Sequence, residues 1–257
     1  MGAALDTAIR RLDLSIERRN FPQFFITAPT PCPYLPGKFE RKVFTHLVGT
    51  DSRSLNTMLS QGGFRRSQNI AYRPACDHCQ ACTSTRVLAK DFVLTKSFKR
   101  VIRKNSDLVA TVVKAQATSE HYSLFRGYID TRHSEGGMAD MSVLDFAAMV
   151  DDTVAESRLV EYRFDKNSEN AGELACTVLM DLLGDGISLI YSFYEPSYES
   201  RSLGTLMVLD AIQRAQRLGL PHVYLGYFVR GSQKMEYKAR FQPQERLSVD
   251  GWKPVTG

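Results

Sequence analysis

The order of strand-like and helix-like segments after residue 107 is the feature that most limits what this chain can fold into. Segments rich in β-branched and alternating apolar residues predict strands, and apolar residues on one side at helical spacing predict helices. Strands are expected over 108–115, 158–164, 172–183, 186–194 and 223–228, and helices over 120–132, 143–150 and 202–218. The order β-α-α-β-β-β-α-β predicts an α+β fold whose sheet mixes parallel and antiparallel strands.

The first part of the chain has a different character. Prolines at positions 22, 29, 31, 33 and 36 exclude a long helix between 21 and 40. A strand is expected across 39–48, and a short helix across 52–61, capped by Ser52 and ended by two glycines. We therefore predict two domains, an N-terminal cysteine-containing domain over 1–107 and a mixed-sheet domain over 108–257.

Composition limits the cellular setting. The chain has 257 residues, 43% of them hydrophobic, and a net charge of +5, which permits contact with nucleic acid without requiring it. It has no apolar run of about 18 residues and no secretory signal, so no membrane span or secretion is expected. Five cysteines, an odd number, predict reduced thiols and a cytoplasmic protein.

Four of the cysteines are candidates for a shared site. Cys76, Cys79 and Cys82 stand at intervals of three, and Cys32 lies between two prolines in the rigid first segment. Three thiolates with Cys32 as the fourth ligand suit zinc or an iron–sulfur cluster, with His78 a sterically less favourable fourth ligand. Reduced, metal-free thiols packed in a small core are the third interpretation. The remaining Cys176 is expected as a buried strand residue.

Residues 96–104 form the most basic stretch of the chain. Five of these nine residues are Lys or Arg and none is acidic. On a helix the basic side chains share one face, and Val101 and Ile102 turn inward. The face is either simply solvated or a contact for nucleic-acid phosphates.

The predicted element order resembles that of the GNAT acyltransferases. Their acyl-coenzyme A loop has a counterpart in the segment Arg201-Ser202-Leu203-Gly204-Thr205-Leu206, which precedes a long helix. Free N–H groups at such a helix start favour an anion. Leu206 stands where that loop has a small residue, and a side chain there is expected to crowd a pyrophosphate.

Several further segments together resemble the aminoacyl-tRNA–protein transferases of the N-degron pathway. The resemblance spans roughly residues 20 to 245 and is closer to the bacterial leucyltransferase branch than to the eukaryotic arginyltransferases. The segments are Pro31-Cys32-Pro33-Tyr34-Leu35-Pro36, Gly63-Phe64-Arg65-Arg66-Ser67, Tyr72-Arg73-Pro74 with the three cysteines that follow, Tyr191-Ser192-Phe193-Tyr194-Glu195-Pro196, Ser202-Leu203-Gly204, Tyr224-Leu225-Gly226-Tyr227 and 234–243.

The resemblance implies transfer of leucine from leucyl-tRNA to proteins that begin with Asp or Glu, marking them for the downstream degradation machinery. No cofactor is required for this chemistry. Arg65 and Arg66 are candidates for the acceptor carboxylate, one of them and not both, because arginine binds carboxylates with a two-pronged fork. Glu195 is the candidate proton acceptor, with Tyr194 beside it. The other expected substrate contacts are Tyr191, Ser202 and Gly204, with Lys238 and Arg240 on the tRNA 3′ end.

Three alternatives remain open from the sequence. An arginyl-tRNA–protein transferase shares the scaffold and differs only in the donor amino acid. A GNAT acetyltransferase that uses acetyl-coenzyme A fits the element order alone. A metal-dependent nucleic-acid module built on the cysteines and residues 96–104 leaves the C-terminal fold without a purpose.

Overall fold

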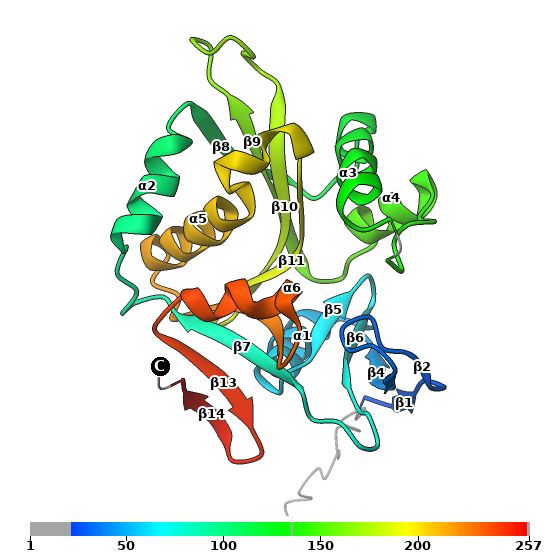
Figure 1. The fold of residues 1–257 in the computed structure, drawn as a ribbon. Coiled ribbons are helices and arrows are strands. Elements are labelled where there is room, and N and C mark those ends of the chain that lie inside the picture. Colours follow the sequence, from blue (N-terminus) through cyan, green and yellow to red (C-terminus); the bar gives the residue numbers. More distant parts are fainter. Residues whose placement is uncertain (1–21, 135, 256–257) are drawn as a thin grey trace, which may run out of the picture.

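A computed structural model describes residues 22–134 and 136–255 of the chain. The expected leader over residues 1–20 lies outside the described residues. The described chain forms one large sheet with helices on both faces and a smaller sheet packed beside it (Figure 1).

The large sheet has eight strands in the order β14-β13-β7-β12-β11-β10-β9-β8. All neighbours are antiparallel except β11 and β12, which are parallel and joined through helix α5. The strands are β7 (Cys82–Leu88), β8 (Leu108–Lys114), β9 (Glu156–Phe164), β10 (Leu174–Leu183), β11 (Gly186–Tyr194), β12 (His222–Val229), β13 (Gln244–Ser248) and β14 (Gly251–Pro254). This layout confirms the predicted α+β class and the GNAT-like arrangement of the C-terminal half.

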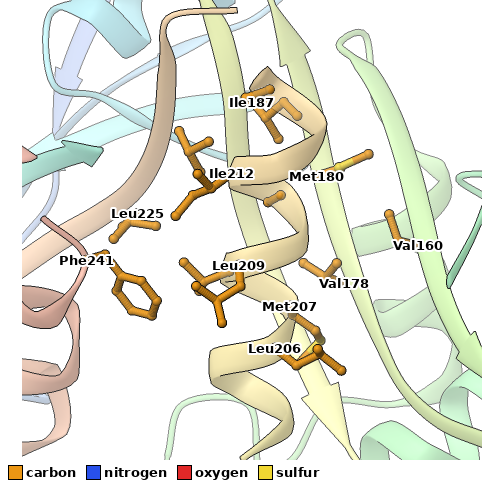
Figure 2. Close-up of a cluster of buried hydrophobic side chains, with 14 of the residues drawn as sticks. Val160, Val178, Met180, Ile187, Leu206, Met207, Leu209, Ile212, Leu225 and Phe241 are labelled. Atoms are coloured by element: carbon orange, nitrogen blue, oxygen red, sulfur yellow. The ribbon is translucent and has the colours of Figure 1, made fainter. Parts of the chain in front are cut away.

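Two hydrophobic cores form on the two faces of this sheet. One core packs α2 (Lys96–Lys104) and α5 (Leu203–Arg217) on the sheet, and the other packs α3 (Ser119–Arg132) and α4 (Val143–Asp151). The central strand β10 is buried on both faces, which explains its nearly continuous apolar sequence. Figure 2 shows α5 on β9, β10 and β11, with Leu206, Met207, Leu209 and Ile212 near Val160, Val178, Met180 and Ile187.

The smaller sheet comes from the N-terminal part of the chain. Its strands are β1 (Phe24–Ile26), β4 (Lys42–His46), β6 (Ile70–Pro74) and β5 (Arg65–Ser67), in that order. A two-stranded ribbon of β2 (Thr30–Pro31) and β3 (Phe39–Glu40) and helix α1 (Ser52–Gln61) accompany it. Short helical segments η1 (Pro196–Arg201), α6 (Gln233–Glu236) and η2 (Tyr237–Arg240) complete the described chain.

A buried ion pair holds the two sheets together. The Arg66 guanidinium on β5 donates two bonds to the Asp181 carboxylate on β10, Nε to Oδ2 at 2.6 Å and Nη2 to Oδ1 at 2.8 Å. Ser157 and Asn56 donate to the same carboxylate, so both charges are satisfied although Arg66 is 3% and Asp181 0% exposed. Strand β5 is thereby fixed against the large sheet.

The predicted helices and long strands are confirmed, with end points shifted by at most two residues. Cys176 is 0% exposed, as expected, and Val101 and Ile102 turn inward on α2. The Ser52 cap is wrong, because Asp51 stands at the cap and the Ser52 hydroxyl donates to the Val154 carbonyl. Strand β7 belongs to the predicted N-terminal domain by its position in the chain, but it lies inside the large sheet. The domain boundary at residue 107 stays a prediction.

Candidate active site

The parallel strands β11 and β12 separate partway along their length. They pair only from Gly186 with His222 to Ser188 with Tyr224, although both continue for several more residues. Beyond these pairs the facing carbonyl groups of the two strands lack their ladder partners. Such a gap in a sheet exposes polar backbone that another group must satisfy.

Arg65 fills the start of this gap. Its Nη2 donates to the carbonyls of Leu189 at 3.0 Å and Ile190 at 2.9 Å on β11, and its Nη1 to Leu225 on β12 at 3.4 Å. No carboxylate lies within 4.0 Å of this guanidinium among the residues that the structure describes. Arg65 is therefore a half-buried cation whose charge is not balanced by an ion pair, a site suited to an anionic group.

Gly226 leaves room for the Arg65 side chain. A Cβ atom built at Gly226 would lie 1.4 Å from Arg65 Nη1, and the residue has a φ of +76°. Because of this close approach and this positive φ, a residue with a side chain at position 226 would force Arg65 or the backbone to move. The glycine in the strand segment Tyr224-Leu225-Gly226-Tyr227 therefore makes room for Arg65, which lies on β5, 160 residues before Leu225.

Lys238 lies next to Arg65 and is buried. It is 4% exposed, and its Nζ donates to the Tyr227 carbonyl at 2.7 Å. Burial, and then the Arg65 charge, lower the pKa of Lys238 well below its usual value. The contact of Lys238 with the tRNA 3′ end stays a prediction, for a residue that is buried here; Arg240 is exposed, with its guanidinium 5.5 Å from the centre of the Phe98 ring.

Aromatic side chains line β11 on the side of helix α3. Tyr191 packs on Phe125, and the Tyr194 and Tyr128 ring centres are 4.8 Å apart. Burial, and then the neighbouring Tyr194, raise the pKa of Tyr128 to about 12, so it is a protonated hydrogen-bond donor at neutral pH. The sequence predicted only that Tyr128 lies in a helix over 120–132; its contact with Tyr194 depends on the packing of α3 on β11.

Of the two candidate arginines, only Arg65 lacks a carboxylate partner among the described residues. Every arm of Arg66 is engaged, by Asp181, Ser157 and the Gln68 carbonyl. Adjacent strand residues point to opposite faces, which places one arginine in the gap and the other in the buried ion pair.

Glu195 does not share a subsite with Arg65. Its Oε1 accepts bonds from the Ser197 backbone N–H and hydroxyl, which makes it the cap of η1. Glu195 follows the Arg65-bound Ile190 by five positions on β11, a separation of roughly 16 Å along a strand. An acceptor amine held near Arg65 is out of its reach.

The predicted anion loop starts helix α5. Ser202 is its N-cap in a left-handed conformation with a φ of 57°, and Gly204 has open space where a Cβ would stand. Arg201 is paired with Asp107 and donates to Asn105. Leu206 is 8% exposed and packs in the core, so the expectation that it crowds the loop is wrong.

The four clustered cysteines line one cavity of about 210 Å³. Cys32, Cys76, Cys79 and Cys82 all contribute to its wall, next to Leu35 and Pro74. Over the described ranges, no group of three or more His, Cys, Asp or Glu side chains is arranged as metal ligands. A soft, all-thiol donor set suits zinc or an iron–sulfur cluster, but these thiols would have to come closer together to bind it. His78 does not line the cavity.

The mixed sheet and the gap between β11 and β12 match the acyltransferase layout that the element order predicted. Family models describe the same chain in two parts: "Arginine-tRNA-protein transferase, N terminus" matches residues 30–100, and "Arginine-tRNA-protein transferase, C terminus" matches residues 120–248. The chain belongs to the arginine-tRNA–protein transferase family. None of the described helices is long and apolar enough to cross a membrane.

Similar proteins cover nearly the whole chain. An aspartate/glutamate leucyltransferase of Azorhizobium caulinodans is 57% identical over 242 residues, which are 92% of this chain and 97% of that protein. One of Afipia carboxidovorans is 58% identical over 235 residues, 91% of this chain and 93% of that protein. Among solved structures, FemX is 9% identical with a TM-score of 0.46, covering 83% of this chain and 81% of that one.

Proposed function

We propose that this protein transfers leucine from leucyl-tRNA to the N-terminal α-amine of proteins that begin with Asp or Glu. The relatives named aspartate/glutamate leucyltransferase support the donor and the acceptor. The single structural observation behind the proposal is Arg65, a half-buried cation in the strand gap with no carboxylate within 4.0 Å among the described residues. The product, a protein with N-terminal Leu, would enter the cytoplasmic degradation machinery.

The reaction needs placement more than it needs a strong nucleophile. The ester of an aminoacyl-tRNA is already activated, so the enzyme must bring an uncharged amine to the carbonyl and let the ribose oxygen leave. Positioning of this kind contributes at most roughly 7–11 kcal/mol to lowering a barrier. Arg65 would bind the acceptor carboxylate, and its fixed carbonyl contacts pre-organise the guanidinium for that role.

The acceptor enters as an ammonium ion and must lose a proton before it attacks. Lys238 is our candidate for the group that receives it, because burial and Arg65 both favour its neutral amine. Glu195 remains the alternative proton acceptor for an amine bound nearer the start of α5, with Tyr194 beside it. Tyr191, Ser202, Gly204 and Arg240 remain proposed contacts of the aminoacyl-tRNA.

We further propose that Cys32, Cys76, Cys79 and Cys82 bind zinc or an iron–sulfur cluster. The cavity whose wall all four cysteines share supports this. The group would act in structure rather than in transfer, by holding the proline-rich segment and the cysteine loop together. It is not needed for the acyl transfer itself.

A transfer assay tests the function. Purified protein receives leucyl-tRNA or arginyl-tRNA and peptides that begin with Asp, Glu, Asn or Ala. Leucine on the Asp and Glu peptides alone is the expected result. Transfer of arginine instead would support the same transfer reaction but contradict leucyl-tRNA as the donor. Absence of transfer with both tRNAs, together with binding of coenzyme A, would favour the acetyltransferase.

A further inference from the structure

Helix α2 carries more unpaired positive charge than any other described helix. Lys96, Lys99, Arg100, Arg103 and Lys104 are all exposed, and none has a carboxylate within 4.0 Å among the described residues. Arginines on α3 and α5 are balanced by acids: Arg126 by Asp130, Arg132 by Glu199, Arg214 by Asp210. The charge on α2 is thus a local feature and not a reflection of a basic chain.

This arrangement works against the helix itself. Lys96 with Arg100, Lys99 with Arg103, and Arg100 with Lys104 are like charges four residues apart, which destabilise a helix. Lys96 also stands in the first turn, where a positive charge opposes the helix dipole and where α2 has no acidic residue. A helix that only faced solvent would be more stable with acids interspersed. A polyanion along this face would relieve both costs.

The basic face is joined to the candidate active site through packed side chains. Phe98 of α2 is 2% exposed and stacks on Phe241 with ring centres 5.3 Å apart. The Arg240 guanidinium, on η2, lies 5.5 Å from the Phe98 ring centre. Two residues before it, Lys238 reaches β12 beside Arg65. The exposed cation Arg240 therefore bridges the surface of α2 and the strand gap.

We propose that α2, with Arg240, is the docking surface for the phosphate backbone of the tRNA acceptor arm. This inference rests on the proposed function and adds the place where the donor RNA lies. The α2 cations would contact duplex phosphates, and Arg240 would contact the single-stranded 3′ end as it enters the gap between β11 and β12. Such contacts set affinity and register and carry no sequence information.

The test compares two variants that lose the same charge. Lys99→Gln/Arg103→Gln removes two cations from α2, and Lys114→Gln/Lys253→Gln removes two exposed cations from β8 and β14. Three quantities are measured: the KM for leucyl-tRNA, the KM for a leucyl ester of the 3′-terminal trinucleotide, and the affinity for uncharged tRNA at several salt concentrations. Thermal unfolding of both variants shows whether they fold.

The α2 variant is expected to bind uncharged tRNA roughly tenfold or more weakly, with a salt dependence reduced by about 2 in slope. Its KM for leucyl-tRNA rises, its KM for the trinucleotide ester and its kcat do not change, and its melting temperature is unchanged or higher. Equal tRNA affinity in the two variants would contradict the docking surface on α2, while transfer activity in both variants would still support the proposed function. Binding of tRNA that depends on α2, without transfer from any aminoacyl-tRNA, would overturn the proposed function and keep the docking surface.

Discussion

At the scale of single residues, chemistry depends on which of two neighbouring arginines faces the strand gap. The sequence predicts that one of Arg65 and Arg66 contacts the acceptor, but it does not say which, because the Leu189 carbonyl that Arg65 binds and the Asp181 carboxylate that Arg66 binds lie more than 100 positions away. Asp181 on β10 engages Arg66, and that contact leaves Arg65 for the gap. The sequence likewise could not predict that Glu195 lies far from Arg65, because that distance depends on how strands far apart in the chain are placed.

Gly226 gives the first prediction at this scale. Gly226→Ala adds a Cβ at a φ of +76° and 1.4 Å from Arg65 Nη1, so it should lower stability by at least about 1–2 kcal/mol from the backbone term alone. It should also displace Arg65 and lower transfer. Gly127→Ala is the control, since its Cβ meets nothing within 4 Å and an alanine in α3 should stabilise by about 0.5–1 kcal/mol. Urea unfolding measures both; equal effects would contradict the close approach.

Lys238 gives the second prediction at the residue scale. Lys238→Met keeps much of the side-chain volume but removes the amine, and kcat should fall about 10²–10⁴-fold if that amine accepts the proton. Because burial and Arg65 lower the pKa of Lys238, the wild-type kcat/KM should rise with pH as this group loses its proton and then level off. The variant should lack that rise. A pH profile identical to the wild type, at whatever rate, would exclude Lys238.

At the scale of elements, long strands and helices were predictable and short strands were not. Strand β11 was predicted to the residue, and α2 and α1 likewise, because each carries a full apolar period. Strands β1, β2, β5, β6, β7, β13 and β14 were missed, and the single strand expected over 39–48 is in fact two strands, β3 and β4. They are short or polar, and their burial depends on partners far along the chain, such as β7 between β12 and β13. The local sequence pattern does not predict pairing between segments so far apart in the chain.

The attachment of β5 to β10 gives the third prediction. Asp181→Asn leaves the Arg66 charge buried without its counterion, which should cost about 3–5 kcal/mol of unfolding free energy. Asp185→Asn is a comparison variant: its carboxylate accepts from Tyr224 and contacts His222 but is only partly buried, so its loss should cost less. Chemical denaturation ranks the two. A smaller loss for Asp181→Asn would contradict the account of the buried clamp.

At the scale of the whole molecule, the sequence predicted the fold class and the family, and the structure adds how the two parts of the chain form one site. The C-terminal half supplies the two strands that separate, and the N-terminal part supplies the arginine between them. Residues 160 positions apart meet there, so spacing in the sequence gave no signal of it. Only the recurring segments of the family pointed to the same residues.

The cysteine cavity gives the fourth prediction. Protein purified under reducing conditions without oxygen should carry zinc or iron by elemental analysis, and Cys32→Ser should lose most of it and melt at a lower temperature. Cys176→Ala is the control because Cys176 lies in the core of β10, away from the cavity, and its metal content should equal that of the wild type. Metal-free wild-type protein with unchanged stability after chelation would support plain, reduced thiols.

The central claim is that Arg65 in the gap between β11 and β12 binds the acceptor carboxylate, and Arg65→Lys tests it most directly. Lysine keeps the charge, but its three N–H donors cannot both hold the three strand carbonyls and bind the substrate carboxylate, so kcat/KM should fall about 100-fold for a peptide beginning with Asp. For a peptide beginning with Ala, whose transfer is slow in any case, it should change little. An equal loss for both peptides would mean that Arg65 only holds the two strands in place, and would contradict the account.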